Sequence, residues 1–179
     1  MAAFDPPPLV TATLGLADES ATARCGQALA HWLAANTDHL QRHGFTLWLS
    51  GDLGAGKTTL VRALLRALGV QGPVKSPTFS LLEPYVVSSL NFYHFDFYRF
   101  SEAAEFDVAG FREMFGPASV CAIEWPERAQ GRLPTPDLSV ALEVRDDGRS
   151  AHCAARSHAG AICLQQMIAT MEQRPPGGG

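Results

Sequence analysis

The sequence lacks the features that would place the protein in a membrane, in a secretory compartment or along a nucleic acid. No apolar run approaches about 18 residues, which argues against a membrane-spanning helix. The opening residues, MAAFDPPPLV, have neither the basic nor the apolar region of a signal peptide. The net charge of −4 disfavours a broad nucleic-acid surface, because such surfaces need clustered Lys and Arg. We therefore expect a cytoplasmic protein.

Cysteine is present only four times, and never at the spacing of a metal site or a redox pair. The sequence contains no C-x-x-C pair. The expected state of each side chain is therefore the free thiol of a reducing compartment. The four residues are Cys25, Cys121, Cys153 and Cys163.

Internal repeats and linkers are also missing, which favours a single domain over residues 10–173. The Pro-rich residues 1–9 are predicted to be a flexible lead-in, and residues 174–179 a disordered tail. Apolar periodicity and turn signals place the elements between them. The expected elements are strands at 10–16, 45–50, 91–100 and 120–124, a hairpin of 138–144 and 151–155, and helices ending near 35 and 69 and spanning 162–171.

The most informative segment that is present is GDLGAGKTT, residues 51–59, which fits the phosphate-loop pattern G-x-x-x-x-G-K-[ST]. Residues 45–50 before it are typical of a buried strand, and residues 60–68 after it have apolar side chains at helical spacing. Four specified positions coincide by chance in well under ~1% of chains of this length. The sequence therefore predicts a nucleoside triphosphate site.

The residue types of this loop suit the chemistry of a triphosphate. Gly54 and Gly56 allow backbone N–H groups to approach the phosphates, and the N-terminus of the following helix adds unpaired N–H groups. We expect Lys57 to reach the β- and γ-phosphates and the Thr58 hydroxyl to ligate Mg²⁺. The nucleotide-binding residues predicted in the loop are Asp52, Leu53, Gly54, Ala55, Gly56, Lys57, Thr58 and Thr59.

The segment HFDFYR, residues 94–99, alternates with period two. On a strand, His94, Asp96 and Tyr98 would share one face. They could be ordinary sheet residues with a solvated carboxylate. A triphosphate site needs carboxylates, however, and this favours a functional role for Asp96.

A second carboxylate, Glu124, ends the apolar run of residues 120–123. This is where a second phosphate-loop signature places an acid that holds Mg²⁺ or polarises the attacking water. The alternative is a surface carboxylate at a strand end. Trp125 follows it, and the sequence alone leaves open whether this ring stacks on the nucleotide base or fills the core.

Two further groups of residues are candidates for contacts with the phosphates. Ser76, Thr78 and Ser80 lie downstream of the loop, where segments that sense a γ-phosphate often occur. Simple turn chemistry around the intervening proline is the alternative. The candidates for charge stabilisation at the phosphates are Arg99, Arg112 and Arg128, although the sequence favours an ordinary surface or ion-pairing arginine at each position.

Four segments taken together resemble the TsaE family, formerly YjeE, a small bacterial ATPase of tRNA threonylcarbamoyladenosine biosynthesis. They are GDLGAGKTT, VKSPTFSLLEPY, YHFDFYR and IEWPER, in this order. Many families share the phosphate loop, whereas the last three segments are specific in combination. The resemblance covers roughly residues 15–149.

This resemblance implies an α/β fold, a P-loop NTPase-like three-layer sandwich. Its central sheet would be mostly parallel, with helices on both faces and an antiparallel extension. Lys57, Asp96 and Glu124 would be the catalytic residues. Thr58 and Glu124 would ligate Mg²⁺, the implied cofactor.

The resemblance also assigns less sharply defined parts of the site. Trp125 would match the family's tryptophan beside the acid, and we predict that it binds the nucleotide. Residues 76–79 would match a switch-like segment, and residues 18–20 a region that covers the base. Phe97 replaces the leucine expected between the aspartate and the tyrosine, which leaves the chemistry unchanged.

The resemblance further implies partners. Proteins of this family bind the complex of TsaB and TsaD, which transfers the threonylcarbamoyl group to adenosine 37 of tRNA. Their ATP hydrolysis supports multiple turnover of that complex. This chain would then be an accessory Mg²⁺-dependent ATPase that meets tRNA only indirectly, and its acidic balance agrees with that.

Two other functions stay open at the level of sequence. A small-molecule P-loop kinase would use Asp96 as the base for a substrate hydroxyl, although the sequence has no arginine-rich cluster for a lid. An ATP-gated docking module would instead order residues 76–85 on binding nucleotide. The absence of a guanine-reading N-K-x-D element favours ATP over GTP.

Overall fold

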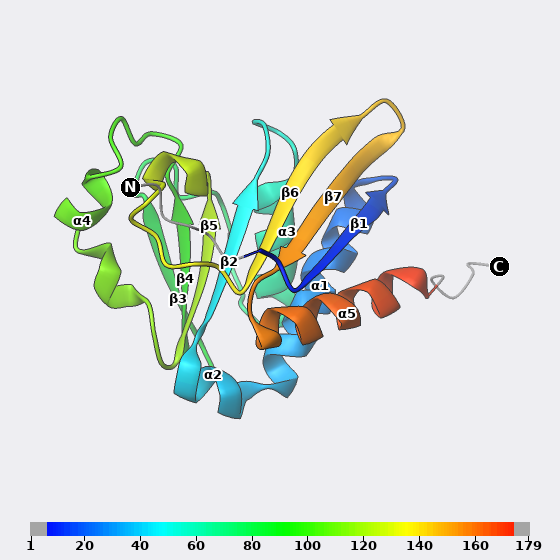
Figure 1. The fold of residues 1–179 in the computed structure, drawn as a ribbon, viewed down its shortest axis with the longest axis horizontal. Helices are drawn as coiled ribbons and strands as arrows, with labels where there is room; N and C mark the ends of the chain where they lie inside the picture. Colours follow the sequence, from blue (N-terminus) through cyan, green and yellow to red (C-terminus); the bar gives the residue numbers. More distant parts are fainter. Residues whose placement is uncertain (1–6, 174–179) are drawn as a thin grey trace.

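One mixed sheet of seven strands organises residues 7–173, the part of the chain that this computed structural model describes. The strand order is β1-β7-β6-β2-β5-β4-β3 (Figure 1). The strands are β1 (Val10–Leu16), β2 (Phe45–Ser50), β3 (Leu82–Val87), β4 (Leu90–Asp96), β5 (Ser119–Glu124), β6 (Leu138–Arg145) and β7 (Gly148–Ala155).

The centre of the sheet is parallel and its edges are antiparallel. Strand β2 pairs in parallel with both β5 and β6, and β4 pairs in parallel with β5. The hairpins β3–β4 and β6–β7 are antiparallel, as is the β1–β7 pair. This arrangement confirms the predicted fold class with its antiparallel extension. It also brings the carboxyl ends of β2, β4 and β5 to one edge, with Asp96 directly opposite Glu124.

Helices cover both faces of the sheet, as predicted (Figure 1). Helix α1 packs against α3 and α5, and α4 contacts η1. In the view of Figure 1, α4 lies on the side of β3, β4 and β5. The helices are α1 (Glu19–Ala35), α2 (Thr37–His43), α3 (Lys57–Ala67), α4 (Glu105–Val108), η1 (Phe111–Met114), η2 (Pro126–Ala129) and α5 (His158–Glu172).

Strand β5 separates two hydrophobic clusters among the described residues. Its side chains are buried on both faces and alternate between the clusters. Val120 and Ala122 join the larger cluster beneath α1, α3 and α5. Cys121 and Ile123 join a smaller, phenylalanine-rich cluster that includes residues of β4, α4 and η1. The continuous apolar run of β5 is what a parallel strand buried on both faces requires.

Helix α1 begins at a well-formed cap and lies unusually close to α3. The Asp18 carboxylate accepts the Ala21 N–H at 2.8 Å and the Ser20 hydroxyl at 2.6 Å, and these bonds lower the pKa of Asp18. Further along α1, a Cβ added at Gly26 would lie 2.3 Å from the Leu60 carbonyl oxygen. Gly26 therefore sets how closely α3, which starts in the phosphate loop, approaches α1.

Several element boundaries differ from those expected. Strand β4 ends at Asp96, because the Asp96 carboxylate accepts the Tyr98 N–H and a turn closes from Phe100 N–H to Phe97 O. The expectation that Tyr98 shares a strand face with Asp96 is therefore wrong. Helix α2 was not expected, and α5 starts earlier than residue 162 because the Ser157 hydroxyl accepts the Gly160 N–H.

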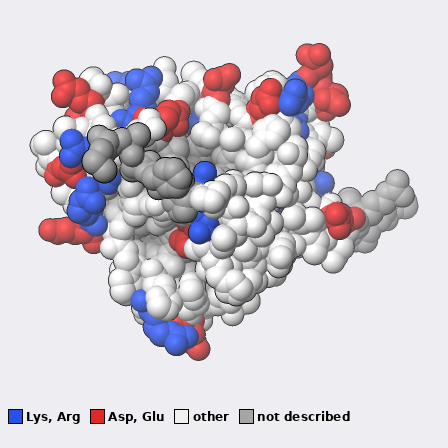
Figure 2. Space-filling view, in the orientation of Figure 1, with Lys and Arg blue, Asp and Glu red and all other residues white. Residues whose placement is uncertain are grey.

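The predicted terminal segments lie almost wholly outside the described residues, which begin at residue 7 and end at 173. Within the predicted lead-in, the Leu9 N–H donates to the Ala155 carbonyl at 2.8 Å and so extends the β1–β7 pairing. Over residues 7–173, no helix has the length and apolar character needed to cross a membrane. On the face shown in Figure 2, acidic and basic side chains are interspersed, without one large basic area.

Candidate active site

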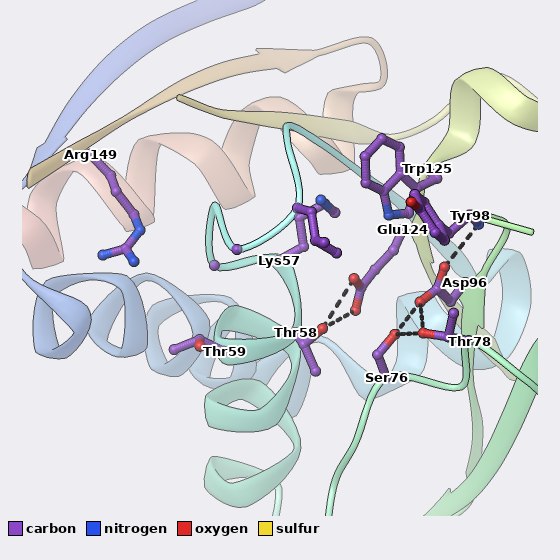
Figure 3. Close-up of a pocket in the computed structure, with 13 residues that line it drawn as sticks. Lys57, Thr58, Thr59, Ser76, Thr78, Asp96, Tyr98, Glu124, Trp125 and Arg149 are labelled. Atoms are coloured by element: carbon purple, nitrogen blue, oxygen red, sulfur yellow. Dashed lines mark hydrogen bonds between the residues drawn. The ribbon is translucent and has the colours of Figure 1, made fainter. Parts of the chain in front are cut away.

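A cavity of about 240 Å³ opens where the carboxyl ends of β4 and β5 meet the N-terminus of α3 (Figure 3). This edge of a parallel sheet is where α/β proteins bind ligands. The cavity is lined by Leu53, Gly54, Gly56, Lys57, Thr58, Thr59, Ser76, Thr78, Asp96, Tyr98, Glu124, Trp125 and Arg149.

The loop between β2 and α3 has the conformation that its glycines predict. Gly51, Gly54 and Gly56 have positive φ values of 128°, 81° and 111°. A Cβ at Gly51 would lie 2.2 Å from the Leu142 carbonyl oxygen, so only glycine fits against β6. Helix α3 begins at Lys57 with no side-chain cap. Its first N–H groups and its dipole are therefore available to an anion.

Lys57 is buried beneath this loop. Its ammonium donates hydrogen bonds to the Gly51 and Asp52 carbonyl oxygens, the second at 2.9 Å. It also lies 4.1 Å from the centre of the Trp125 ring. Burial lowers the pKa of Lys57, and the carboxylates nearby, chiefly Glu124, oppose this effect. The site thus places the Lys57 ammonium close to the carboxylates that line it.

Glu124, at the end of β5, accepts hydrogen bonds from two side chains. The Thr58 hydroxyl lies 2.9 and 3.1 Å from its two carboxylate oxygens. On the other side, His94 Nε2 lies 2.8 Å from Oε1, and the His94 ring is completely buried. An ionised carboxylate only accepts, so Nε2 is the protonated nitrogen of His94 in this contact. The carboxylate orientation is therefore fixed by α3 and β4 together.

Asp96, at the end of β4, accepts hydrogen bonds from the segment that follows α3. Its Oδ2 accepts the hydroxyls of Ser76 and Thr78, the latter at 2.8 Å, and its Oδ1 accepts the Tyr98 N–H at 2.9 Å (Figure 3). The Asp96 residue is 3% exposed. The hydroxyls of Ser76 and Thr78 thus hold the predicted switch segment against Asp96, at the edge of the cavity.

Trp125 closes one side of the cavity in a strained backbone conformation. Its φ and ψ of 59° and 49° are left-handed, which is uncommon for a residue other than glycine. The next residue is Pro126, which disfavours the right-handed helical region for Trp125. The ring lies over the Lys57 ammonium and 5.0 Å from the Tyr98 ring centre. Trp125 thus lines the cavity and also packs against the smaller hydrophobic cluster.

The donor set suits a small, hard cation held jointly with phosphate oxygens. Thr58, Glu124 and Asp96 present oxygen atoms to one cavity, and oxygen is the ligand that Mg²⁺ prefers. Among the described residues, no group of three or more His, Cys, Asp or Glu side chains could by itself hold a metal. Mg²⁺ characteristically uses one or two carboxylates plus substrate phosphates, so these residues fit the predicted cofactor.

Most of the residues predicted from sequence meet in this cavity. Asp52 and Ala55 do not line it: Asp52 contributes a carbonyl to Lys57, and Ala55 is fully buried. Ser80 also lies outside the lining. The predicted nucleotide and catalytic residues found together are Leu53, Gly54, Gly56, Lys57, Thr58, Thr59, Asp96, Glu124 and Trp125.

The arginine that lines the cavity is not one of those proposed from sequence. Arg112 pairs with Asp107, Arg99 stacks on Phe79, and Arg128 lies 6.0 Å from the Tyr98 ring, all outside the lining. Arg149 lines it instead. Its only sequence signal is its place just after a hairpin turn, which does not indicate a site.

Comparison with known proteins supports the same reading. The family model described as "Threonylcarbamoyl adenosine biosynthesis protein TsaE" matches residues 16–152. The tRNA threonylcarbamoyladenosine biosynthesis protein TsaE of Haemophilus influenzae is 45% identical over 114 residues, 64% of this chain and 72% of that protein. The protein of the same name from Treponema pallidum is 38% identical over 125 residues, 70% of this chain and 91% of its own length.

A solved structure supports the fold. The crystal structure of YdiB from Bacillus subtilis aligns with a TM-score of 0.63 at 23% sequence identity, over 89% of this chain and 94% of that one. The family model spans most of the chain, including the loop of residues 51–59 and both buried carboxylates. The chain belongs to the TsaE family.

Proposed function

We propose that this protein is a Mg²⁺-dependent ATPase that serves tRNA threonylcarbamoyladenosine biosynthesis as an accessory subunit of a TsaB–TsaD complex. The biosynthetic role follows from membership of the family. The observation that carries the hydrolytic part is the contact of the Thr58 hydroxyl with both carboxylate oxygens of Glu124, at 2.9 and 3.1 Å. It joins the residue that ends the phosphate loop to a buried acid.

Binding of the triphosphate is assigned to the loop and to Lys57. Backbone N–H groups from Gly54 to Thr59 would surround the phosphates, and the Lys57 ammonium would exchange its carbonyl partners for β- and γ-phosphate oxygens. Trp125, which lies 4.1 Å from that ammonium, would limit the access of water to it. The nearby carboxylates, chiefly Glu124, oppose the lowering of the Lys57 pKa that burial causes.

The acids are assigned separate roles. Thr58 and Glu124 would hold Mg²⁺, which when bound supplies positive charge to the β- and γ-phosphate oxygens. Asp96 would accept a hydrogen bond from the attacking water and orient it towards the γ-phosphorus. The new bond joins that water oxygen to phosphorus, and the bond from phosphorus to the β–γ bridging oxygen breaks. The protons of the water stay with the phosphate that forms, and ADP is the leaving group. Ser76 and Thr78 would hold Asp96 in place.

The deciding experiment is Mg²⁺-dependent ATP hydrolysis by the purified chain, with and without a TsaB–TsaD complex. We expect slow turnover alone and strong stimulation by the complex. Lys57→Ala and Asp96→Asn should abolish the stimulated rate, whereas Glu143→Gln, which alters an exposed carboxylate on β6, should not change it. Equal turnover with and without the complex would overturn the accessory role, and a strict requirement for a hydroxylated acceptor would favour a kinase.

One observation favours a second candidate, an ATP-gated docking module. The segment tied to Asp96 carries Phe79, which is 84% exposed and stacks against the Arg99 guanidinium at 4.1 Å. Nucleotide binding at Asp96 could therefore alter the presentation of an apolar side chain. The test is Glu124→Gln: if this variant binds ATP and TsaB–TsaD, lacks hydrolysis and still supports continued tRNA modification, docking is the function and hydrolysis is dispensable.

A further inference from the structure

We propose that Arg149 is a binding residue for the α-phosphate of the nucleotide. This inference rests on the proposed function, since it assumes a nucleoside triphosphate in the cavity. It adds a cationic contact at the nucleoside end of the phosphate chain, opposite the end where Asp96 and Glu124 lie. Arg149 is far from the phosphate loop in the sequence, and the pairing of β7 within the sheet brings it to the same cavity.

The fold gives Arg149 a fixed position beside the loop. Arg149 pairs with Leu16 on β1 and with Val144 on β6, so its backbone is held from both sides. Gly148 before it has a φ of 139°, and a Cβ there would lie 2.5 Å from the Leu16 carbonyl oxygen. Along β7, Arg149 shares a face with Ala151, which lies in the core beneath the helices. The side chain of Arg149 therefore leaves β7 on the face covered by the helices, near the start of the strand.

The guanidinium lies against the phosphate loop without a partner. A Cβ at Gly56 would lie 3.6 Å from Arg149 Nε. This nitrogen is buried, and within the described part of the chain it has no hydrogen-bond partner. No carboxylate among residues 7–173 lies within ion-pair distance of Arg149 either.

Other arginines of the protein contrast with this one. Arg112 and Arg132 both pair with Asp107, and Arg145 pairs with Glu143 on the same hairpin as Arg149. The Nε atoms of Arg24 and Arg156 are also buried and unpaired among the described residues, but neither side chain lines the cavity. Arg149 alone in the lining combines an unpaired guanidinium nitrogen with access to the site.

The position of the acids fixes which phosphate Arg149 would meet. Mg²⁺ bridges the β- and γ-phosphates in P-loop enzymes, so the γ-end must lie towards Thr58 and Glu124. In Figure 3, Arg149 lies on the opposite side of Lys57 from Glu124, over the side of the loop helix where Thr59 is drawn. The phosphate chain would thus run from Glu124 across the loop towards Arg149. The phosphate at that end is the α-phosphate.

The chemistry of arginine suits this position. Its guanidinium is always charged and offers a planar fork of donors that matches two phosphate oxygens. Thr59 and the loop residues Gly54 and Gly56 line the same cavity. A charge-assisted contact of this kind corresponds to about a 10- to 100-fold change in affinity.

The experiment measures dissociation constants of ADP and of a non-hydrolysable ATP analogue, without Mg²⁺, for Arg149→Gln and the unaltered protein. We expect both nucleotides to bind about 10- to 100-fold more weakly to the variant, and by the same factor. Arg149→Lys, which keeps the charge but loses the fork, should recover part of that loss. The matched control is Arg145→Gln on the same hairpin, which should bind both nucleotides normally.

The outcomes separate the two proposals. Unchanged affinity of Arg149→Gln for both nucleotides would overturn the assignment of Arg149 while leaving nucleotide binding intact. A loss confined to the ATP analogue would also overturn it, because it would place the guanidinium at the γ-phosphate. An unaltered protein that bound neither nucleotide would remove the proposed function itself. A shared thermal-unfolding midpoint of variant and control confirms that the folds are comparable.

Discussion

At the scale of single residues, the site depends on a chain of hydrogen bonds that crosses three elements. His94 on β4 contacts Glu124 on β5, and Glu124 accepts from Thr58 at the start of α3. His94 and Glu124 are buried, whereas Thr58 is half-buried and lines the cavity. In the proposed role of Glu124 as a Mg²⁺ ligand, this support would orient the carboxylate before the metal binds. Loss of such a supporting group typically weakens metal affinity about 10- to 100-fold.

The first prediction concerns His94. Replacement by Phe keeps the volume of the ring but removes the 2.8 Å contact with Glu124. We expect His94→Phe to raise the Mg²⁺ concentration needed for half-maximal ATP hydrolysis by about 10- to 100-fold, with little change in Mg²⁺-free ADP binding. His152→Phe, which alters an exposed histidine on β7, is the control. An unchanged Mg²⁺ requirement in His94→Phe would show that Thr58 alone positions Glu124.

At the scale of the elements, the position of α3 determines where the loop N–H groups point. Helix α3 is held against α1 at Gly26, where backbone meets backbone. A side chain that clashes with another side chain can rotate away, but a clash with a carbonyl oxygen can be relieved only by moving a helix. Overpacking of this kind typically costs about 1–3 kcal/mol.

The second prediction follows from that contact. Gly26→Ala should destabilise the protein by about 1–3 kcal/mol, measured by urea unfolding, and should weaken ADP binding because α3 carries Lys57 and Thr58. The control is Gly15→Ala in β1, where an added Cβ meets nothing within 4 Å. Gly26→Ala with wild-type stability would mean that α1 and α3 separate without cost. Normal nucleotide affinity in a destabilised variant would mean that the loop is positioned independently of α1.

At the scale of the whole molecule, cores on both faces of the sheet bury every cysteine. Cys25, Cys121, Cys153 and Cys163 are all free and buried, as expected for thiols that need no partner. Burial raises the pKa of Cys25 to about 11 and that of Cys153 to about 12, and it raises the pKa of the other two as well. Thiolates are the reactive form, so the native thiols should be inert.

The third prediction is therefore a pH dependence of both reactivity and stability. At pH 8 a thiol reagent should modify the native protein only at the rate of unfolding, and all four thiols at once. Because the folded pKa values exceed the ordinary 9.0, the native state retains protons that the unfolded state releases. This contribution to stability is complete below about pH 9 and is lost as the pH rises further. Rapid modification of a single thiol in the native protein would contradict the assignment.

The architecture could be predicted well because its signals are local or periodic. The phosphate loop and the β6–β7 hairpin each depend on residues close together in sequence. The predictions that failed concern element boundaries that depend on side-chain contacts. Strand β4 ends early because the Asp96 carboxylate accepts the Tyr98 N–H, and α2 is a single short helix docked through the buried Leu40.

What the sequence alone determined is the family, the mixed α/β fold and the candidate phosphate, metal and acid residues. Those follow from short motifs whose residue types are dictated by the chemistry of a triphosphate. Only the tertiary structure decided that His94 supports Glu124, that Ser76 and Thr78 fasten to Asp96, and that Arg149 reaches the loop. The physical reason is that such meetings depend on strand register and helix packing, which place side chains from distant segments within hydrogen-bond reach.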